Sequence, residues 1–293
     1  MTTSKEYEEP WLLQQWSWVY RTVPKVHIPF TNFDVSITIL AAISLYFVKL
    51  LGERILEAYG WPSDDPLTKE GAASIAAIAH STTLVPGLWF ALRSQPYVPS
   101  SKMSEHPQWW QDAVTALLQF CTGYMIYDGL VNIVILRWET GMNPSDWMFL
   151  GHHFATSFYM TSSRLVGAGH ISALTCMLLG EATNPAHNSF MISQLAKTLE
   201  IHNDESLLVY VIEVLFCTLY IVFRVVLGPI GMLHITYDLV VTERGQKNIP
   251  MALKLVWLLM IWGVVFGSVP WIQECYEMLM KHAEAATTSD KEL

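Results

Sequence analysis

The chain has 293 residues, of which 52% are hydrophobic and 15% are Asp, Glu, Lys or Arg. Soluble domains contain about 25% of these charged residues, so the composition indicates a protein that exposes much of its surface to lipid. The formal net charge of −9 and the absence of a run of Lys or Arg exclude nucleic acid as a partner, because phosphates bind clustered cations. Four cysteines without CxxC spacing favour buried thiols over a zinc site or a disulfide framework.

The N-terminal segment, residues 1–32, mixes Trp11, Trp16, Trp18 and Tyr20 with polar residues. Indole rings prefer the headgroup layer of a membrane, so we predict that this segment lies at the interface before the first span. A flexible tail is the alternative, because chain termini are often poorly ordered.

Long apolar stretches follow, close to the ~20 residues that cross a bilayer core. We predict an all-α polytopic bundle of about seven spans around a central polar or lipid cavity, with a kink or break at Pro229, just after the sixth span. The predicted parts are the interfacial segment (1–32), a first span with its loop (33–67), a main transmembrane domain (68–275) and a polar tail (276–293). The predicted spans are Val35–Leu51, Ala72–Ala91, Ala113–Leu136, Trp147–Leu165, Ala168–Ile192, Leu207–Leu227 and Met251–Trp271.

The orientation of these spans is encoded by the Lys and Arg residues of the loops and tails. Nine of them fall on the N-terminal side of the predicted bundle and six fall on the other side. Cytoplasmic loops carry the excess of positive charge, so we expect the N-terminus in the cytoplasm.

Polar residues recur at helical spacing within three of the spans. An ionisable residue in lipid is costly unless it faces a bundle interior, so these residues are candidates for a site. Together with His80 in the second span, they predict a common cavity or a buried network in which Asp128 and Glu181 contact Arg224. A purely structural network of ion pairs is the alternative. The three stripes are Cys121, Tyr124, Asp128 and Asn132; Glu181, Asn184, Pro185 and Asn188; and Glu213, Cys217, Tyr220 and Arg224.

Two adjacent histidines, His152 and His153, lie in the fourth span. Neighbours on a helix point about 100° apart, so we expect one imidazole to face the cavity and the other to bond to a neighbouring helix. A neutral imidazole can act as a general base on a hydroxyl or amine, or as a nucleophile. The other histidines are too far away in sequence for a membrane di-iron box, and no mid-span lysine is placed for retinal. We therefore expect no metal site and no bound cofactor.

Five segments of the chain, in this order and spacing, resemble the TLC-domain family, which includes the ceramide synthases and the translocation-associated membrane proteins. The resemblance covers about residues 68–275 and implies a bundle of membrane helices around a lipid-accessible cavity, commonly in the endoplasmic reticulum. It also implies a role in lipid metabolism, lipid sensing or protein trafficking. The segments are SIAAIAHSTTLVPG, GYMIYDGLVNI, GHHFATSFYM, LGEATNPAHN and FRVVLGPIGM.

The histidine pair has a counterpart in one branch of that family. In ceramide synthases a double histidine belongs to the active site that transfers an acyl group from acyl-coenzyme A to a sphingoid amine. His152 and His153 match that pair. The aspartate-containing segment that follows it in ceramide synthases is replaced here by LGEATNPAHN, which resembles the non-synthase branches.

Two functions remain open at this point. The first is a protein that binds a membrane lipid or acyl chain and acts in lipid metabolism or membrane lipid homeostasis. In its acyltransferase form acyl-coenzyme A is the co-substrate, one imidazole is the base or acyl acceptor, Asp128 or Glu181 orients it, and Arg224 holds an anionic headgroup or balances a carboxylate. The second is a non-catalytic trafficking or structural protein, or an accessory subunit of a larger membrane complex, whose partners are other membrane proteins or a second copy of the chain.

Overall fold

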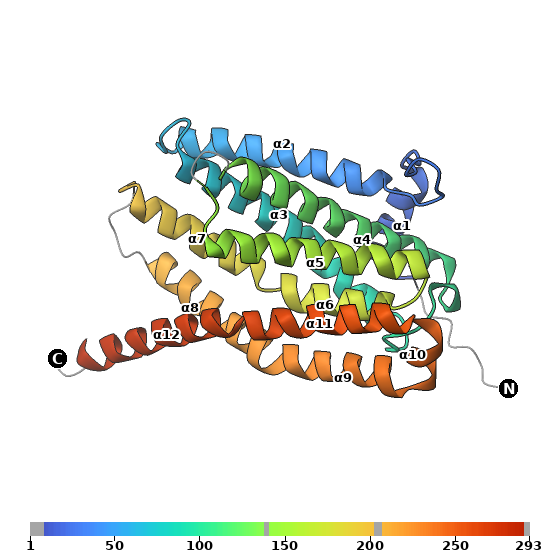
Figure 1. Cartoon of the computed structure of the whole chain (residues 1–293). Coiled ribbons are helices and arrows are strands. Elements are labelled where there is room, and N and C mark those ends of the chain that lie inside the picture. The colour runs from blue at the N-terminus through green and yellow to red at the C-terminus, as the bar shows by residue number, and fades with distance from the viewer. Residues whose placement is uncertain (1–8, 138–140, 202–206, 290–293) are drawn as a thin grey trace.

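The computed structural model describes residues 9–137, 141–201 and 207–289, so the predicted interfacial segment and C-terminal tail lie partly outside it. This part of the chain is all-α, as predicted, and its only β pairings are isolated bridges at His27–Asp34 and Lys102–Ala168. The elements shown in Figure 1 are α1 (Trp11–Thr22), α2 (Ser36–Ala58), α3 (Pro66–Arg93), η1 (Met103–Glu105), α4 (Gln108–Tyr127), η2 (Asp128–Ile135), α5 (Pro144–Val166), α6 (His170–Glu181), α7 (Asn184–Thr198), α8 (Leu207–Ile221), η3 (Val222–Leu227), α9 (Gly228–Val241), α10 (Glu243–Asn248), α11 (Met251–Gly267) and α12 (Val269–Ser289).

Four helical stretches within the described ranges are long and apolar enough to cross a membrane: Pro66–Arg93, Gln108–Ile135, Leu207–Val241 and Met251–Glu284. They make the chain a polytopic membrane protein by length and composition. About half of the residues in the most apolar part of the first two are buried in the bundle, against 22% and 17% in the last two. The exposed stretches α8–α9 and α11–α12 form one side of the bundle, and α12 projects beyond it toward the C-terminus (Figure 1).

The largest hydrophobic core cluster of the described residues joins α3, α4 and α6. It contains Leu84 and Leu88 of α3, Trp110 and Leu117 of α4, and Leu174 of α6, all with no exposed surface. Helices α2 and α4 approach closely because residue 123 is a glycine. A Cβ atom there would lie only 2.3 Å from the Thr38 carbonyl oxygen.

The ends of α5 are encoded locally. Asn143 and Asp146 form a capping box, in which each side chain accepts a hydrogen bond from the other residue's backbone N–H at 2.9 Å, and Pro144 occupies the first turn. The helix ends at Gly167, whose φ of 66° is in the left-handed region that glycine adopts most readily. These two ends set the limits of the helix that carries His152 and His153.

Three helices are interrupted where polar residues of the predicted stripes occur. The α-helix gives way to π-helix at Asp128, and again over the turn that contains Arg224. The predicted span Ala168–Ile192 consists of two helices, α6 and α7, with a break just after Glu181, where the stripe that contains Pro185 indicates one. Pro185 lacks the N–H that would continue α6, which explains the break. At the kink or break predicted near Pro229 the helix forms the π-helical turn η3, which ends at Leu227, and α9 starts at Gly228. Interruptions of this kind re-aim side chains, and they are frequent at functional sites.

Candidate functional site

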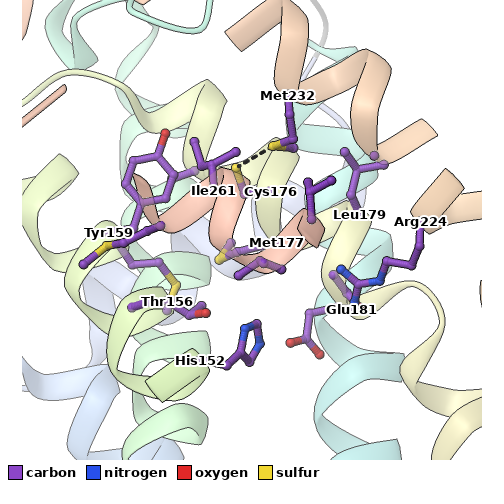
Figure 2. Close-up of a pocket in the computed structure, with 18 of the residues that line it drawn as sticks. His152, Thr156, Tyr159, Cys176, Met177, Leu179, Glu181, Arg224, Met232 and Ile261 are labelled. Carbon is purple, nitrogen blue, oxygen red and sulfur yellow. Dashed lines mark hydrogen bonds between the residues drawn. The ribbon is translucent and has the colours of Figure 1, made fainter. Parts of the chain in front are cut away.

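Two adjoining cavities lie between α5, α6, η3 and α11. We call the larger one, of about 430 Å³, the polar cavity, and the smaller one, of about 80 Å³, the apolar cavity. His152, Glu181 and Arg224 line both, so these three side chains mark their junction. The polar cavity is also lined by Tyr124, Asp128, His153, Asn184, His187 and Asn188. The apolar cavity is also lined by Tyr159, Met160, Cys176, Met177, Met232 and Ile261, several of which are labelled in Figure 2.

His153 links α5 to the end of α4. Its Nε2 atom lies 2.8 Å from Oδ2 of Asp128, and its Nδ1 atom lies 2.6 Å from the Phe149 carbonyl oxygen. The amide of Asn132 donates to the other oxygen of Asp128 at 2.6 Å. Both ring nitrogens of His153 face acceptors, so a doubly protonated ring satisfies both contacts and the carboxylate balances its charge.

His152 has a different environment from its neighbour. The two imidazole rings are nearly perpendicular, with an interplanar angle of 88°. Within the described part of the chain the His152 ring makes no hydrogen bond, and it points toward Glu181 at the junction of the cavities (Figure 2). One histidine is therefore tied to a neighbouring helix and one faces the cavity, as the 100° angle between helix neighbours predicts.

Glu181 is held by residues of α3 and α7. Its Oε2 atom accepts hydrogen bonds from Ser81 Oγ at 3.1 Å and from Asn184 Nδ2 at 2.8 Å. The Nδ1 atom of His80 lies 3.5 Å from the same oxygen, and the completely buried His80 ring stacks on Tyr124 with 3.9 Å between centroids. Glu181 therefore joins three helices at one wall of the cavities.

Arg224 does not contact Asp128 or Glu181, in contrast to the predicted network. Its Nη2 atom donates to the Gly180 carbonyl oxygen at 3.4 Å, its guanidinium lies 5.4 Å from the centroid of the Tyr220 ring, and no carboxylate of the described residues forms an ion pair with it. The prediction failed because each carboxylate has donors of its own. The three residues share the cavities without forming one hydrogen-bonded network.

Two other predicted residues differ in their relation to the cavities. Asn188 lines the polar cavity, and its amide donates to the Asn184 carbonyl oxygen at 2.9 Å. Glu213 lines neither cavity. Its Oε1 atom lies 3.3 Å from Nε2 of His282, an ion pair that joins α8 to α12.

The junction of the cavities offers one side chain with an unused acid–base group. An imidazole without a hydrogen-bond partner can accept a proton or attack a carbonyl carbon, and His152 sits where a hydrocarbon-lined space meets a polar one.

The described residues contain no group of three or more His, Cys, Asp or Glu suited to hold a metal ion. The cysteines are free, and Cys121, Cys217 and Cys275 are buried.

Comparison with known proteins places this architecture in a family. The family model of the TLC domain matches residues 72–276. The chain belongs to the TLC-domain family. A TLC domain-containing protein of Arabidopsis thaliana is 27% identical to it over 176 residues, which are 59% of this chain and 65% of that protein, so the match spans less than two thirds of the relative's length. No solved structure matches the chain.

Sequence reasoning on this TLC-domain chain missed several cavity residues. His187 lines the polar cavity between the rings of Phe216 and Trp271, whose centroids lie 5.0 and 5.4 Å away. Its position three residues after Asn184 on the same helical face was the available signal. The methionines of the apolar cavity carry no such signal, because a buried methionine has the same pattern as any core residue.

Proposed function

We propose that this TLC-domain protein binds a lipid acyl chain in its two adjoining cavities and acts in lipid metabolism or membrane lipid homeostasis. The observation that supports this most strongly is the division of polarity at His152. Methionine, leucine and isoleucine side chains make up much of the lining of the smaller space, whereas the larger one adds carboxylate, amide and imidazole groups to its aromatic and aliphatic lining. A lipid acyl group is divided in the same way, into a hydrocarbon chain and a polar carbonyl end.

The reaction that best suits this site is acyl transfer, with acyl-coenzyme A as the co-substrate. In this proposal His152 removes the proton from the acceptor's hydroxyl or amine while the acceptor oxygen or nitrogen attacks the thioester carbonyl carbon. The carbon–sulfur bond breaks, and the leaving thiolate receives the proton from His152. His153 acts as a positioning residue, because its bond to Asp128 holds α5 in place.

The number of membrane crossings and the orientation of the chain are part of the same proposal. Seven crossings would be made by α2, α3, α4–η2, α5, α6–α7, α8–η3–α9 and α11–α12. The described ends of the chain lie at opposite ends of the bundle, as an odd number of crossings requires (Figure 1). We propose a cytoplasmic N-terminus in the endoplasmic reticulum membrane, with Trp11 and Trp18 of α1, which are 71% and 63% exposed, at its surface. Glycosylation acceptor sites introduced at each end would test the orientation.

Lipid mass spectrometry of the protein purified in a mild detergent tests the binding proposal. Ala155 lines both cavities, so Ala155→Phe should fill their junction and remove the co-purifying acyl lipid. Ala252→Phe is the matched control, because Ala252 is exposed on α11 and should retain the lipid. A wild-type protein that carries no acyl lipid, or equal occupancy in both variants, would contradict the proposal and favour a trafficking or structural role.

A further inference from the structure

We propose that Arg224 binds an oxyanion on the lipid ligand, so that the preferred ligand is an acyl lipid bearing a phosphate or a carboxylate. This inference rests on the proposed lipid-binding function and names the class of headgroup. The Nε atom of Arg224 is buried and has no hydrogen-bond partner, and its one polar contact in the described structure is the 3.4 Å bond from Nη2 to the Gly180 carbonyl oxygen. A guanidinium has five N–H donors, so most of its donor capacity is unused.

The charges around the cavities support the same assignment. The carboxylates that line them are Asp128, paired with His153, and Glu181, which accepts from Ser81 and Asn184. Neither forms an ion pair with Arg224. A charge withdrawn from water without a counterion is costly. An anionic ligand group would supply the missing counterion, and phosphate and carboxylate match the planar fork of a guanidinium.

The setting of Arg224 fixes where that group would lie. The Tyr220 ring and the Gly180 carbonyl hold the guanidinium at the junction of the cavities, and Glu181 lies between it and His152 in the view of Figure 2. His187 lines the adjoining polar cavity, and its ring makes no hydrogen bond within the described residues, so it can donate to the same ligand. An oxyanion at Arg224 would place the attached acyl chain at the mouth of the apolar cavity.

Binding of three radiolabelled lipids with the same chain tests this assignment. The probes are oleoyl lysophosphatidic acid, oleate and monooleoylglycerol, which bear a phosphate, a carboxylate and a neutral headgroup. We expect one of the two anionic probes to bind the detergent-purified full chain at least about tenfold more tightly than the neutral one. Tighter binding of the first identifies a phosphate ligand, and tighter binding of oleate identifies a carboxylate ligand.

Variants then connect the preference to Arg224. Arg224→Gln should weaken binding of the preferred anionic probe by about 10- to 100-fold and leave monooleoylglycerol binding unchanged. Arg93→Gln is the control, because Arg93 is exposed on α3. Thermal unfolding without lipid is measured first. If Arg224→Gln does not fold, Arg224→Lys carries the test and should weaken only the anionic probe. Equal binding of the three probes, unaffected by substitution, would overturn the oxyanion assignment but leave lipid binding intact, whereas binding of none would overturn both.

Discussion

His153 and Asp128 are joined by a 2.8 Å hydrogen bond across the boundary between α5 and η2, while the preceding residue, His152, faces the cavities without a partner among the described residues. The pair therefore divides two tasks between its members: His153 holds α5 against η2, and His152 stays available to a ligand. One histidine would perform both tasks poorly. A ring held by a carboxylate and a carbonyl is oriented but has no free nitrogen. A ring without such bonds keeps a nitrogen available to a ligand.

This separation predicts different consequences for the two histidines. If the protein transfers acyl groups, His152→Ala should lower the rate by about 10²- to 10⁴-fold, the usual contribution of a general base, with little change in thermal unfolding. His153→Ala should instead lower the unfolding temperature, because the Asp128 carboxylate loses its partner. Activity with a defined acyl-coenzyme A and thermal unfolding in detergent measure the two effects. Equal losses of stability in both variants would contradict the division of roles.

The bond between His153 and Asp128 predicts a thermodynamic coupling. Removing one member of a buried charged pair costs about 3–5 kcal/mol, because the other charge is left unpaired. Asp128→Leu should therefore be strongly destabilising, and adding His153→Leu should recover part of that loss. Unfolding free energies of the two single variants and the double variant form the cycle. Additive losses would show that the two side chains do not depend on one another.

The close contact between α2 and α4 predicts a steric cost at Gly123. Gly123→Ala would place a methyl group 2.3 Å from the Thr38 carbonyl oxygen and 2.8 Å from Ala41 Cβ, and should lower stability by about 1–3 kcal/mol as the helices separate. Gly151→Ala is the matched helical control, because nothing lies within 4 Å of its added Cβ. It should be neutral or stabilising by up to about 1 kcal/mol. Similar unfolding temperatures for the two variants would contradict this packing.

His106, in the connection before α4, predicts a pH effect outside the spans. Burial lowers the pKa of its imidazole below the usual 6.5, the charge of Arg244 adds to this, and Glu105 opposes it. The ring nitrogens lie 2.9 Å from Ser101 Oγ and 3.1 Å from Gln95 Oε1, contacts that suit the neutral form. The resulting stability is complete above pH 6.5 and is lost as the pH falls below it, because the unfolded chain then binds a proton that the folded chain excludes.

The check is thermal unfolding between about pH 7.5 and 5.5, the range that brackets histidine titration. The wild type should lose stability across this interval, and His106→Asn should lose less, since one source of proton uptake on unfolding has been removed. An identical pH dependence in both proteins would show that His106 does not contribute.

The periodicity of residues along single helices predicted much of this structure, but it could not predict the contacts between helices. The 3.6-residue repeat was sufficient to predict the all-α fold, the polar stripe through Asp128 and the divergent directions of His152 and His153. The repeat could not predict which partner each carboxylate has, because any carboxylate in a bundle is a plausible partner for any cation. In the structure Asp128 pairs with His153, and Glu181 pairs with Ser81 and Asn184. The expected contacts of Arg224 failed for that reason.

The interruptions of the helices were predicted less accurately than the helices themselves. The stretch with Glu181 and Pro185 carried a visible signal for a break, because proline ends a helix. The π-helical turn at Asp128 has no such signal, since it depends on how the neighbouring helices pack, whereas the turn at Arg224 directly precedes Pro229. These turns aim the two side chains at the cavities.

Photo-crosslinking tests the central claim, that an acyl chain occupies the junction beside His152. The full chain in detergent would be labelled with a fatty acid carrying a diazirine in its chain, and the adducts would be mapped by peptide mass spectrometry. We expect adducts on Met160, Cys176, Met177 and Met232 of the apolar cavity, which unlabelled lipid should compete away and Ala155→Phe should abolish. Adducts confined to the exposed outer faces of α9 and α11, insensitive to competitor and to Ala155→Phe, would contradict it.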